Sequence, residues 1–273
     1  MWILSQRFIN LLGLSLALFF GAGCTGQDES HRWLLAEQYV KAGNYRRGID
    51  EYTRIVNSSS NSTRSIRAQM EIANIFGSHL KDFPKAIASY RKASESSKEA
   101  SIKIQAHLEI SKIYSEKLED PSSAAKELET LFDSIAQFQK EGPDVLLLCA
   151  KNLMDAGKFD SAAKKYASFR TLFPGHKEGP RTLFDEAQAH LAARNLDSAK
   201  VLFNETISKF SESIEYSALV GEAYYGLGNA HEAAGDLSTA LESYQKSLAL
   251  YPNKKVIELK IERVLKRQKE KQI

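Results

Sequence analysis

The clearest pattern in the chain is a column of small residues, each followed four positions later by a large apolar residue. Residues four apart share one face of an α-helix, so each match predicts a helix whose small residue admits a close neighbour. The small residues are Gly48, Ala86, Ala124, Ala162, Ala199 and Ala240, at spacings of 38, 38, 38, 37 and 41 residues, and the large ones are Tyr52, Tyr90, Leu128, Tyr166, Phe203 and Tyr244. The chain therefore carries six copies of one unit.

A second column of small residues precedes the first in every copy and predicts a partner helix. It consists of Ala36, Ala73, Ser111, Ala150, Ala187 and Gly228. Between the two columns lie the turns AGNY, LKDF, LEDP, AGKF, ARNL and AGDL, in which a small or polar kink ends one helix before the next begins. Copies two and three are one residue longer, with Ile75 and Asp82 matching Ile113 and Asp120. Each pair is predicted to be an antiparallel hairpin that buries its apolar faces by stacking on its neighbours.

The last copy resembles the tetratricopeptide repeat (TPR). The residues that carry the resemblance are Tyr224, Leu227, Gly228, Gly235, Ala240, Tyr244 and Pro252. The resemblance implies an all-α fold, an α-α solenoid of about six TPR-like helical hairpins over residues 31–253. Residues 254–273 are expected to form a basic C-terminal capping helix and tail, whose apolar stripe of Ile257, Ile261, Val264 and Leu265 covers the last hairpin.

The N-terminus predicts export. After Arg7, residues 8–20 form an apolar stretch shorter than the roughly 20 residues of a membrane span but typical of a secretory signal. Small residues 21–23 then precede Cys24, which resembles the lipobox of bacterial lipoproteins, where the cysteine is acylated and becomes the new N-terminus. Residues 1–23 are then the signal peptide and residues 24–30 a lipidated tether. The alternative is ordinary cleavage near Gly23, with Cys24 left as a free thiol.

The residue after Cys24 is Thr25, whereas lipoproteins retained in the inner membrane often carry an acidic residue there. The resemblance therefore implies a lipid anchor at the periplasmic face of the bacterial outer membrane. Cys149 is then the one remaining thiol, and its apolar surroundings, LLLCAKNL, favour a buried structural cysteine over a nucleophile.

Composition and motifs argue against an enzyme. A chain that is 43% hydrophobic and 26% charged is a folded protein, and its net charge of +3 gives no nucleic-acid signal. It contains no HExxH, P-loop or dinucleotide-binding glycine loop. His190 and His231 occupy one column of the repeat, where core packing explains them better than catalysis, and acidic turn residues such as Asp120 fit helix capping. We expect no catalytic residue, no metal site and no cofactor.

The first helices of TPR proteins commonly line a concave groove that holds a partner segment. Two rows of this groove are carried over by counting from the small residues. The apolar row, three positions before, is Trp33, Met70, Leu108, Leu147, Phe184 and Tyr225, and the polar row, one position after, is Glu37, Asn74, Lys112, Lys151, Gln188 and Asn229. The apolar row lacks the lysines of repeats that clamp a terminal carboxylate, which favours an apolar or amphipathic segment of another envelope protein. The alternative is that longer repeats bury this row as core.

The resemblance implies a non-catalytic protein–protein interaction scaffold or adaptor at the bacterial envelope, within machinery such as barrel assembly, secretin pilotins or cell-wall adaptors. A periplasmic holdase chaperone is one alternative, and an envelope enzyme with an unrecognised site is another. The C-terminal segment 254–271 holds eight basic and three acidic residues. This excess predicts contact with anionic lipid or an acidic partner, or else a solvated outer face of the capping helix.

Overall fold

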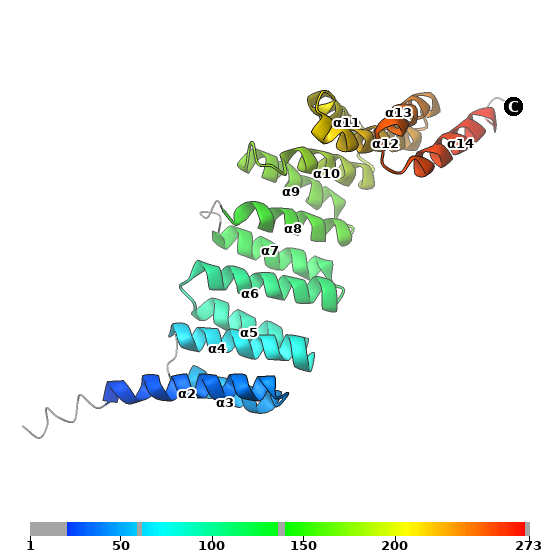
Figure 1. Ribbon diagram of the computed structural model, residues 1–273. Coiled ribbons are helices and arrows are strands. Elements are labelled where there is room, and N and C mark those ends of the chain that lie inside the picture. Colours follow the sequence, from blue (N-terminus) through cyan, green and yellow to red (C-terminus); the bar gives the residue numbers. More distant parts are fainter. Residues whose placement is uncertain (1–20, 59–61, 136–139, 271–273) are drawn as a thin grey trace, which may run out of the picture. The chain divides into compact units, whose positions relative to one another are not determined.

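The computed structural model describes residues 21–58, 62–135 and 140–270, and for residues 21–27 it describes the backbone alone. Within these ranges the chain is helical and contains no strand (Figure 1). The helices are α2 (Gly21–Lys41), α3 (Tyr45–Ser58), α4 (Thr63–Asn74), α5 (Phe83–Ser96), α6 (Ala100–Lys112), α7 (Pro121–Ile135), α8 (Gly142–Asp155), α9 (Phe159–Leu172), α10 (Gly179–Ala192), α11 (Leu196–Phe210), α12 (Ser217–Ala234), α13 (Leu237–Leu250) and α14 (Lys254–Glu270). The expected all-α solenoid of TPR-like hairpins with a C-terminal helix is confirmed.

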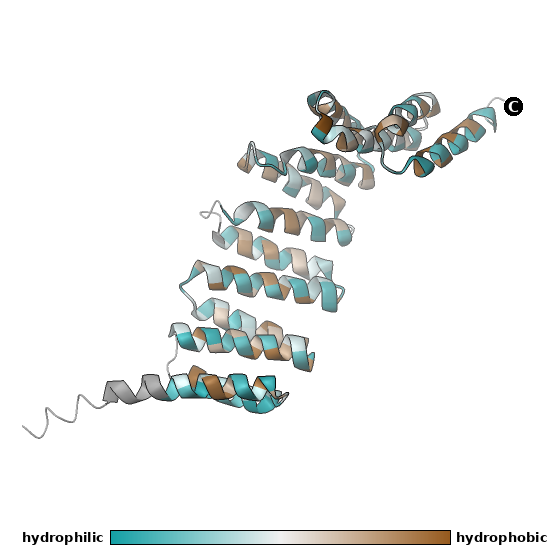
Figure 2. Cartoon of the chain, in the orientation of Figure 1, coloured by the Kyte–Doolittle hydropathy of each residue, from teal (hydrophilic) through white to brown (hydrophobic). Residues whose placement is uncertain are grey.

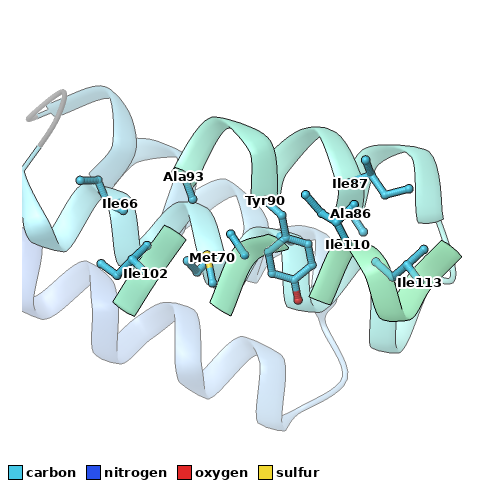
Figure 3. Close-up of a cluster of buried hydrophobic side chains, with 11 residues drawn as sticks. Ile66, Met70, Ala86, Ile87, Tyr90, Ala93, Ile102, Ile110 and Ile113 are labelled. Carbon is cyan, nitrogen blue, oxygen red and sulfur yellow. The ribbon is translucent and has the colours of Figure 1, made fainter. Parts of the chain in front are cut away.

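The chain divides into two compact units, with the boundary between Leu118 and Glu119. Unit 1 contains α2 to α6, and unit 2 contains α7 to α14. Along each helix, apolar positions alternate with polar ones at helical spacing (Figure 2). In unit 1, one cluster of buried side chains joins α4, α5 and α6 around Tyr90 and Ile110 (Figure 3). Neighbouring helices thus bury their apolar faces against each other, as the stacking of hairpins requires.

The N-terminal predictions lie mostly outside the described residues. Residues 1–20 and the side chain of Cys24 are not described, so the signal peptide and the lipidation remain predictions. Residues 24–30, expected to be a tether, lie inside α2. Glu29 is buried there and its carboxylate accepts a hydrogen bond of 2.8 Å from the hydroxyl of Ser58 at the end of α3. At least Glu29, at the end of the expected tether, therefore packs within the first hairpin.

The extra residue of copies two and three is accommodated as a π-helical turn. α4 continues as η1 (Ile75–Leu80) and α6 continues as η2 (Ile113–Lys117), both of them π-helices. A π-turn accommodates one additional residue while the chain stays helical. The alignment of Ile75 with Ile113 in the sequence was the signal for this feature.

Every hairpin turn within the described residues uses one left-handed residue, the second of its four-residue turn. These residues are Gly43, Lys81, Glu119, Gly157, Arg194 and Gly235, with φ values of 77°, 55°, 51°, 70°, 66° and 85°. Glycine adopts this conformation without strain, whereas a residue with a Cβ does not. The next residue caps the second helix in several turns, as expected for Asp120, whose carboxylate accepts the backbone N–H of Ser123 at 2.9 Å.

Replacing Arg194 by glycine is expected to raise the free energy of unfolding by roughly 0.5–1 kcal/mol. The left-handed conformation strains arginine in the folded state, and removing this strain outweighs the larger conformational entropy that glycine gives the unfolded chain. Arg194 is exposed, so little packing is lost. Urea unfolding followed by circular dichroism measures the change. The matched control is Gly157→Arg, in which the same exchange runs in reverse and should destabilise. An unchanged midpoint for both variants would contradict the expectation.

The C-terminal helix covers the last hairpin with a narrower stripe than expected. Ile257 and Val264 are fully buried against α13, and Ile261 packs beside them. Leu265, which was predicted to belong to this stripe, is instead 40% exposed. It lies about 100° beyond Val264 around the helix, which carries it past the edge of the buried face.

Candidate interaction groove

Three residues of the predicted groove come together in unit 2. Leu147 and Lys151 of α8 face Gln188 of α10 across a pocket of about 350 Å³. The pocket is also lined by Met154, Tyr166, Glu178, Arg181, Thr182 and Asp185. Leu147, Met154 and Tyr166 supply its apolar part, and charged side chains of α10 supply one wall. A part-apolar recess with a polar margin is the usual anatomy of an interface that receives a protein segment.

An ionic network fixes the α10 wall of this pocket. The guanidinium of Arg181 pairs with Asp185 at 3.0 Å and with Glu222 of α12 at 2.8 Å. It also lies 4.8 Å from the ring centroid of Phe184. Burial raises the pKa of Asp185, and the charge of Arg181 opposes this rise. By contrast Lys151 on α8 is exposed and pairs with no carboxylate among the described residues, so its charge is open to a ligand.

Arg181, Asp185 and Tyr166 were missed by the sequence analysis. A signal for two of them was present, since Arg181 and Asp185 precede Gln188 by seven and three residues and therefore share its face of α10. Tyr166 was assigned to the core column of α9, and it is indeed buried, yet it also lines the pocket.

The apolar row divides between core and surface. Met70 and Phe184 are 6% and 3% exposed, so both are core residues, as the alternative interpretation expected. Figure 3 shows Met70 beside Ile102, inside the cluster of unit 1. The other four members of the row are half-buried: Trp33, Leu108, Leu147 and Tyr225. The row is therefore not one continuous binding surface.

Trp33 has its own recess in unit 1. Its ring packs edge-on against Tyr52 with centroids 5.1 Å apart, and its indole N–H donates to Glu37 at 3.0 Å. It lines a pocket of about 430 Å³ with Thr63, Arg64 and Arg67 of α4. Lys112, another predicted groove residue, is exposed at the end of α6.

Two asparagines of the polar row have a structural role. The side-chain oxygen of Asn229 accepts a hydrogen bond of 2.8 Å from the hydroxyl of Tyr244, and Asn74 accepts one from Tyr90. In both hairpins the tyrosine of the second helix is thereby tied to the first helix. These hydrogen bonds therefore connect the polar row of the first helices to the column of large residues on the second helices.

A polar cluster around Glu232 in unit 2 was not anticipated. Glu232 of α12 is 9% exposed, and its carboxylate accepts three hydrogen bonds and forms one further ion pair with side chains of α13 and α14. The donors are Tyr244 at 2.8 Å, Arg263 at 2.6 Å and Arg267 at 2.7 Å, with Lys260 at 3.8 Å as an ion pair. Lys260 also donates to Asn229 at 2.9 Å. Three basic residues of the C-terminal segment therefore hold α14 onto α12, a role that neither interpretation of that segment considered.

The same cluster shifts the pKa of Glu232. Burial by itself raises the pKa, but hydrogen bonds from Tyr244 and Arg263 and the charges of Lys260 and Arg263 outweigh it and lower the pKa. Burial, with the neighbouring carboxylate, raises the pKa of Tyr244. The ionised carboxylate and the neutral phenol are thus the forms that this cluster stabilises.

Cys149 is a structural residue, as expected. It is 1% exposed, its thiol lies 3.6 Å from the carbonyl oxygen of Ala125, and burial raises its pKa to about 11. A thiol with a raised pKa is a poor nucleophile at neutral pH. His231 lies 3.3 Å from Asp236, and the buried Nδ1 of His190 has no hydrogen-bond partner in the described parts of the chain.

Within the described residues, no group of three or more histidine, cysteine, aspartate or glutamate side chains is arranged to hold a metal ion. No helix in residues 21–58, 62–135 and 140–270 has the length and hydropathy that crossing a membrane requires.

Comparison with known proteins gives one family match. Residues 221–254, which span most of α12, all of α13 and the start of α14, match the tetratricopeptide repeat. No curated protein sequence matches the chain. Among solved structures, BtubC from P. vanneervenii is 15% identical with a TM-score of 0.50, and the match covers 79% of this chain and 90% of that one. YrrB, described as a TPR protein with an unusual peptide-binding site, is 17% identical with a TM-score of 0.48, over 76% of this chain and 95% of that one.

A third structure is PilW, described as a type IV pilus biogenesis factor. It is 17% identical with a TM-score of 0.47, over 85% of this chain and 97% of that one. At such identities a likeness shows a shared fold and nothing of function.

Proposed function

We propose that this chain of TPR-type hairpins is a non-catalytic interaction scaffold that holds a segment of a partner protein in the α8–α10 groove. The observation that carries the proposal is the pocket in which Leu147, Lys151 and Gln188 meet. Each belongs to a row that the resemblance to TPR proteins assigns to the groove, and together they line a recess large enough for one or two side chains.

The chemistry of the recess favours an amphipathic partner segment. Leu147, Met154 and Tyr166 give the partner's apolar side chains a surface to cover, while Lys151 and Gln188 offer donors at the margin. Arg181 is already fixed by Asp185 and Glu222, so the wall that it forms is ordered before the partner arrives. A preformed wall reduces the entropy cost of binding.

We also propose that the scaffold is lipid-anchored through Cys24 at the periplasmic face of the outer membrane, where it serves an envelope machine. This part rests on the sequence of residues 1–25. Mass spectrometry of the mature N-terminus tests it: an acylated Cys24 is expected, and Cys24→Ser should release the protein from membranes because the acyl chains supply the anchoring energy. A mature N-terminus at another residue would contradict the anchor.

Site-specific photocrosslinking in cells tests the groove. A photoreactive residue placed at Leu147 or Gln188 should give one or two discrete protein adducts, whereas the matched control at Lys164, exposed on α9, should give none. Many weak adducts from both groove positions would instead indicate the holdase alternative. Equal adducts from Leu147 and Lys164 would contradict the assignment of the groove.

A charge placed in the recess should weaken binding of the captured partner. Leu147→Glu is expected to reduce the affinity by about tenfold or more, because a carboxylate would lie where the partner's apolar side chain packs. Isothermal titration calorimetry with the partner identified by crosslinking measures this. Lys164→Glu, which introduces a carboxylate on α9, should leave the affinity unchanged.

A further inference from the structure

The hairpin turns of unit 1 carry an unbalanced positive charge. The turn segments 41–47 and 79–85 contain Lys41, Arg46, Arg47, Lys81 and Lys85 but a single acidic residue, Asp82. Asp82 is engaged by Lys85 at 2.7 Å. The remaining four cations, Lys41, Arg46, Arg47 and Lys81, are exposed and form no ion pair with a carboxylate among the described residues. We refer to these four as the basic edge.

Two residues of the basic edge, Arg46 and Arg47, line a recess with an aromatic and apolar wall. A pocket of about 410 Å³ is lined by Gly43, Asn44, Tyr45, Arg46, Arg47 and Leu80. The ring of Tyr45 stacks on the ring of His79 with centroids 4.4 Å apart and planes 12° apart, and this stack joins the two turns. Leu80 is 38% exposed. The recess thus offers apolar surface close to unpaired charge.

The basic groups are held in place by the fold. The guanidinium of Arg47 lies 5.7 Å from the ring centroid of Tyr39. Lys81 occupies the left-handed position of its turn, and the following N–H, of Asp82, donates to the carbonyl of Phe76 at 2.9 Å. Lys81 therefore occupies a backbone position that is glycine in three other hairpin turns, and its side chain contributes one positive charge to the basic edge.

We propose that the basic edge is a docking surface for an acidic protein segment that carries an apolar side chain. The apolar side chain enters the recess between Tyr45 and Leu80, and neighbouring carboxylates pair with Arg46, Arg47 and Lys81. Complementary charge of this kind steers association and fixes the register of the bound segment, and arginine presents its donors in a fork that matches a carboxylate.

A protein segment suits this surface better than other polyanions. A nucleic acid is bound by many phosphate contacts along an extended track of cations, and the basic edge covers two adjacent turns. A lipid surface is broad and has no side chain to place in the recess. The surface lies in unit 1, whereas the α8–α10 groove lies in unit 2, so this inference does not depend on the groove.

Fluorescence anisotropy of the full mature chain with defined probes tests the docking surface. The probes are a short labelled peptide of glutamate, serine and one central leucine, its counterpart with glutamine in place of glutamate, and its counterpart with serine in place of leucine. The glutamate–leucine peptide should bind most tightly, and Arg46→Gln/Arg47→Gln should weaken it by about tenfold, since two partly exposed charge pairs are lost. Circular dichroism should show an unchanged fold, because both arginines are exposed and neither forms an ion pair with another part of the chain that the structure describes.

The matched control is Lys92→Gln/Lys98→Gln, which removes the same charge from exposed positions at the other end of the α5 hairpin. It should leave the affinity unchanged. Equal affinity for the glutamate and glutamine peptides, an equal loss in the control variant, or no binding of any peptide would overturn the proposal. Tighter binding of anionic vesicles or of an oligonucleotide, abolished by the arginine substitutions, would assign the edge to that class of partner and overturn it as well.

Discussion

Replacing Phe203 by alanine is expected to lower the free energy of unfolding of unit 2 by about 3–5 kcal/mol, the usual cost of removing a buried aromatic ring. Phe203 of α11 is fully buried and packs against Phe184, with ring centroids 5.7 Å apart. The ring also lies against Gly226 of α12, where a Cβ would come within 2.4 Å of it. Its removal leaves a cavity shared by α10, α11 and α12.

The effect of Gly226→Ala should change sign when the ring is removed. In the native chain the added methyl collides with Phe203, so a loss of about 1–2 kcal/mol is expected despite the better helix propensity of alanine. In the Phe203→Ala background the same substitution should stabilise by about 1 kcal/mol, because propensity now acts without the collision. Urea unfolding of the four proteins gives the coupling energy. The same effect of Gly226→Ala in both backgrounds would contradict this packing.

Replacing Glu232 by alanine is expected to cost about 2–3 kcal/mol and to loosen α14, because one buried carboxylate receives three basic side chains of that helix. This expected cost is smaller than the cost of breaking a fully buried ion pair, because the side chains of Arg263 and Arg267 are 54% and 42% exposed and can be solvated. Hydrogen exchange of α14 and urea unfolding measure the two effects. Glu262→Ala on the exposed face of α14 is the matched control, and an equal effect of both substitutions would contradict the role of Glu232.

The contribution of Glu232 should also depend on pH. Because its pKa is lowered in the folded protein, the stabilisation is present above the usual glutamate pKa and is lost as the pH falls through the lowered value. The difference in unfolding free energy between the native chain and Glu232→Gln should therefore shrink as the solution is acidified from neutral pH. A difference that stays constant across the acid range would show that the charge of Glu232 is not what holds α14.

The sequence by itself determined the local design of this protein. A small residue marks where one helix packs closely on its neighbour, and a ring four positions later marks where the remaining gap is filled. This pair occurs as Ala86 with Tyr90 and again as Ala240 with Tyr244. Both features depend on residues within one helical turn, so the sequence alone reveals them. The same holds for the position of the turns, the capping by Asp120 and the burial of Cys149. Periodicity records which face of a helix is apolar, and in this chain that was enough for the fold class.

Part of the candidate groove was accessible from the sequence in the same way. Counting from Ala150 and Ala187 selected Leu147, Lys151 and Gln188, which meet in the pocket. The same rule also selected Met70 and Phe184, which are core residues. Equivalent positions differ in depth because exposure depends on how closely the neighbouring hairpin approaches, and no residue of the helix itself records that distance.

Tertiary structure alone decided the contacts between distant residues. Lys260, Arg263 and Arg267 share one face of α14 by helical spacing, but their carboxylate stands 28 to 35 residues earlier in the chain. The sequence showed that this helix is basic, but it could not show that the buried carboxylate of Glu232 pairs with it. Helical period fixes the direction of each side chain about its own axis, whereas the partner it meets is set by the packing of one helix on another.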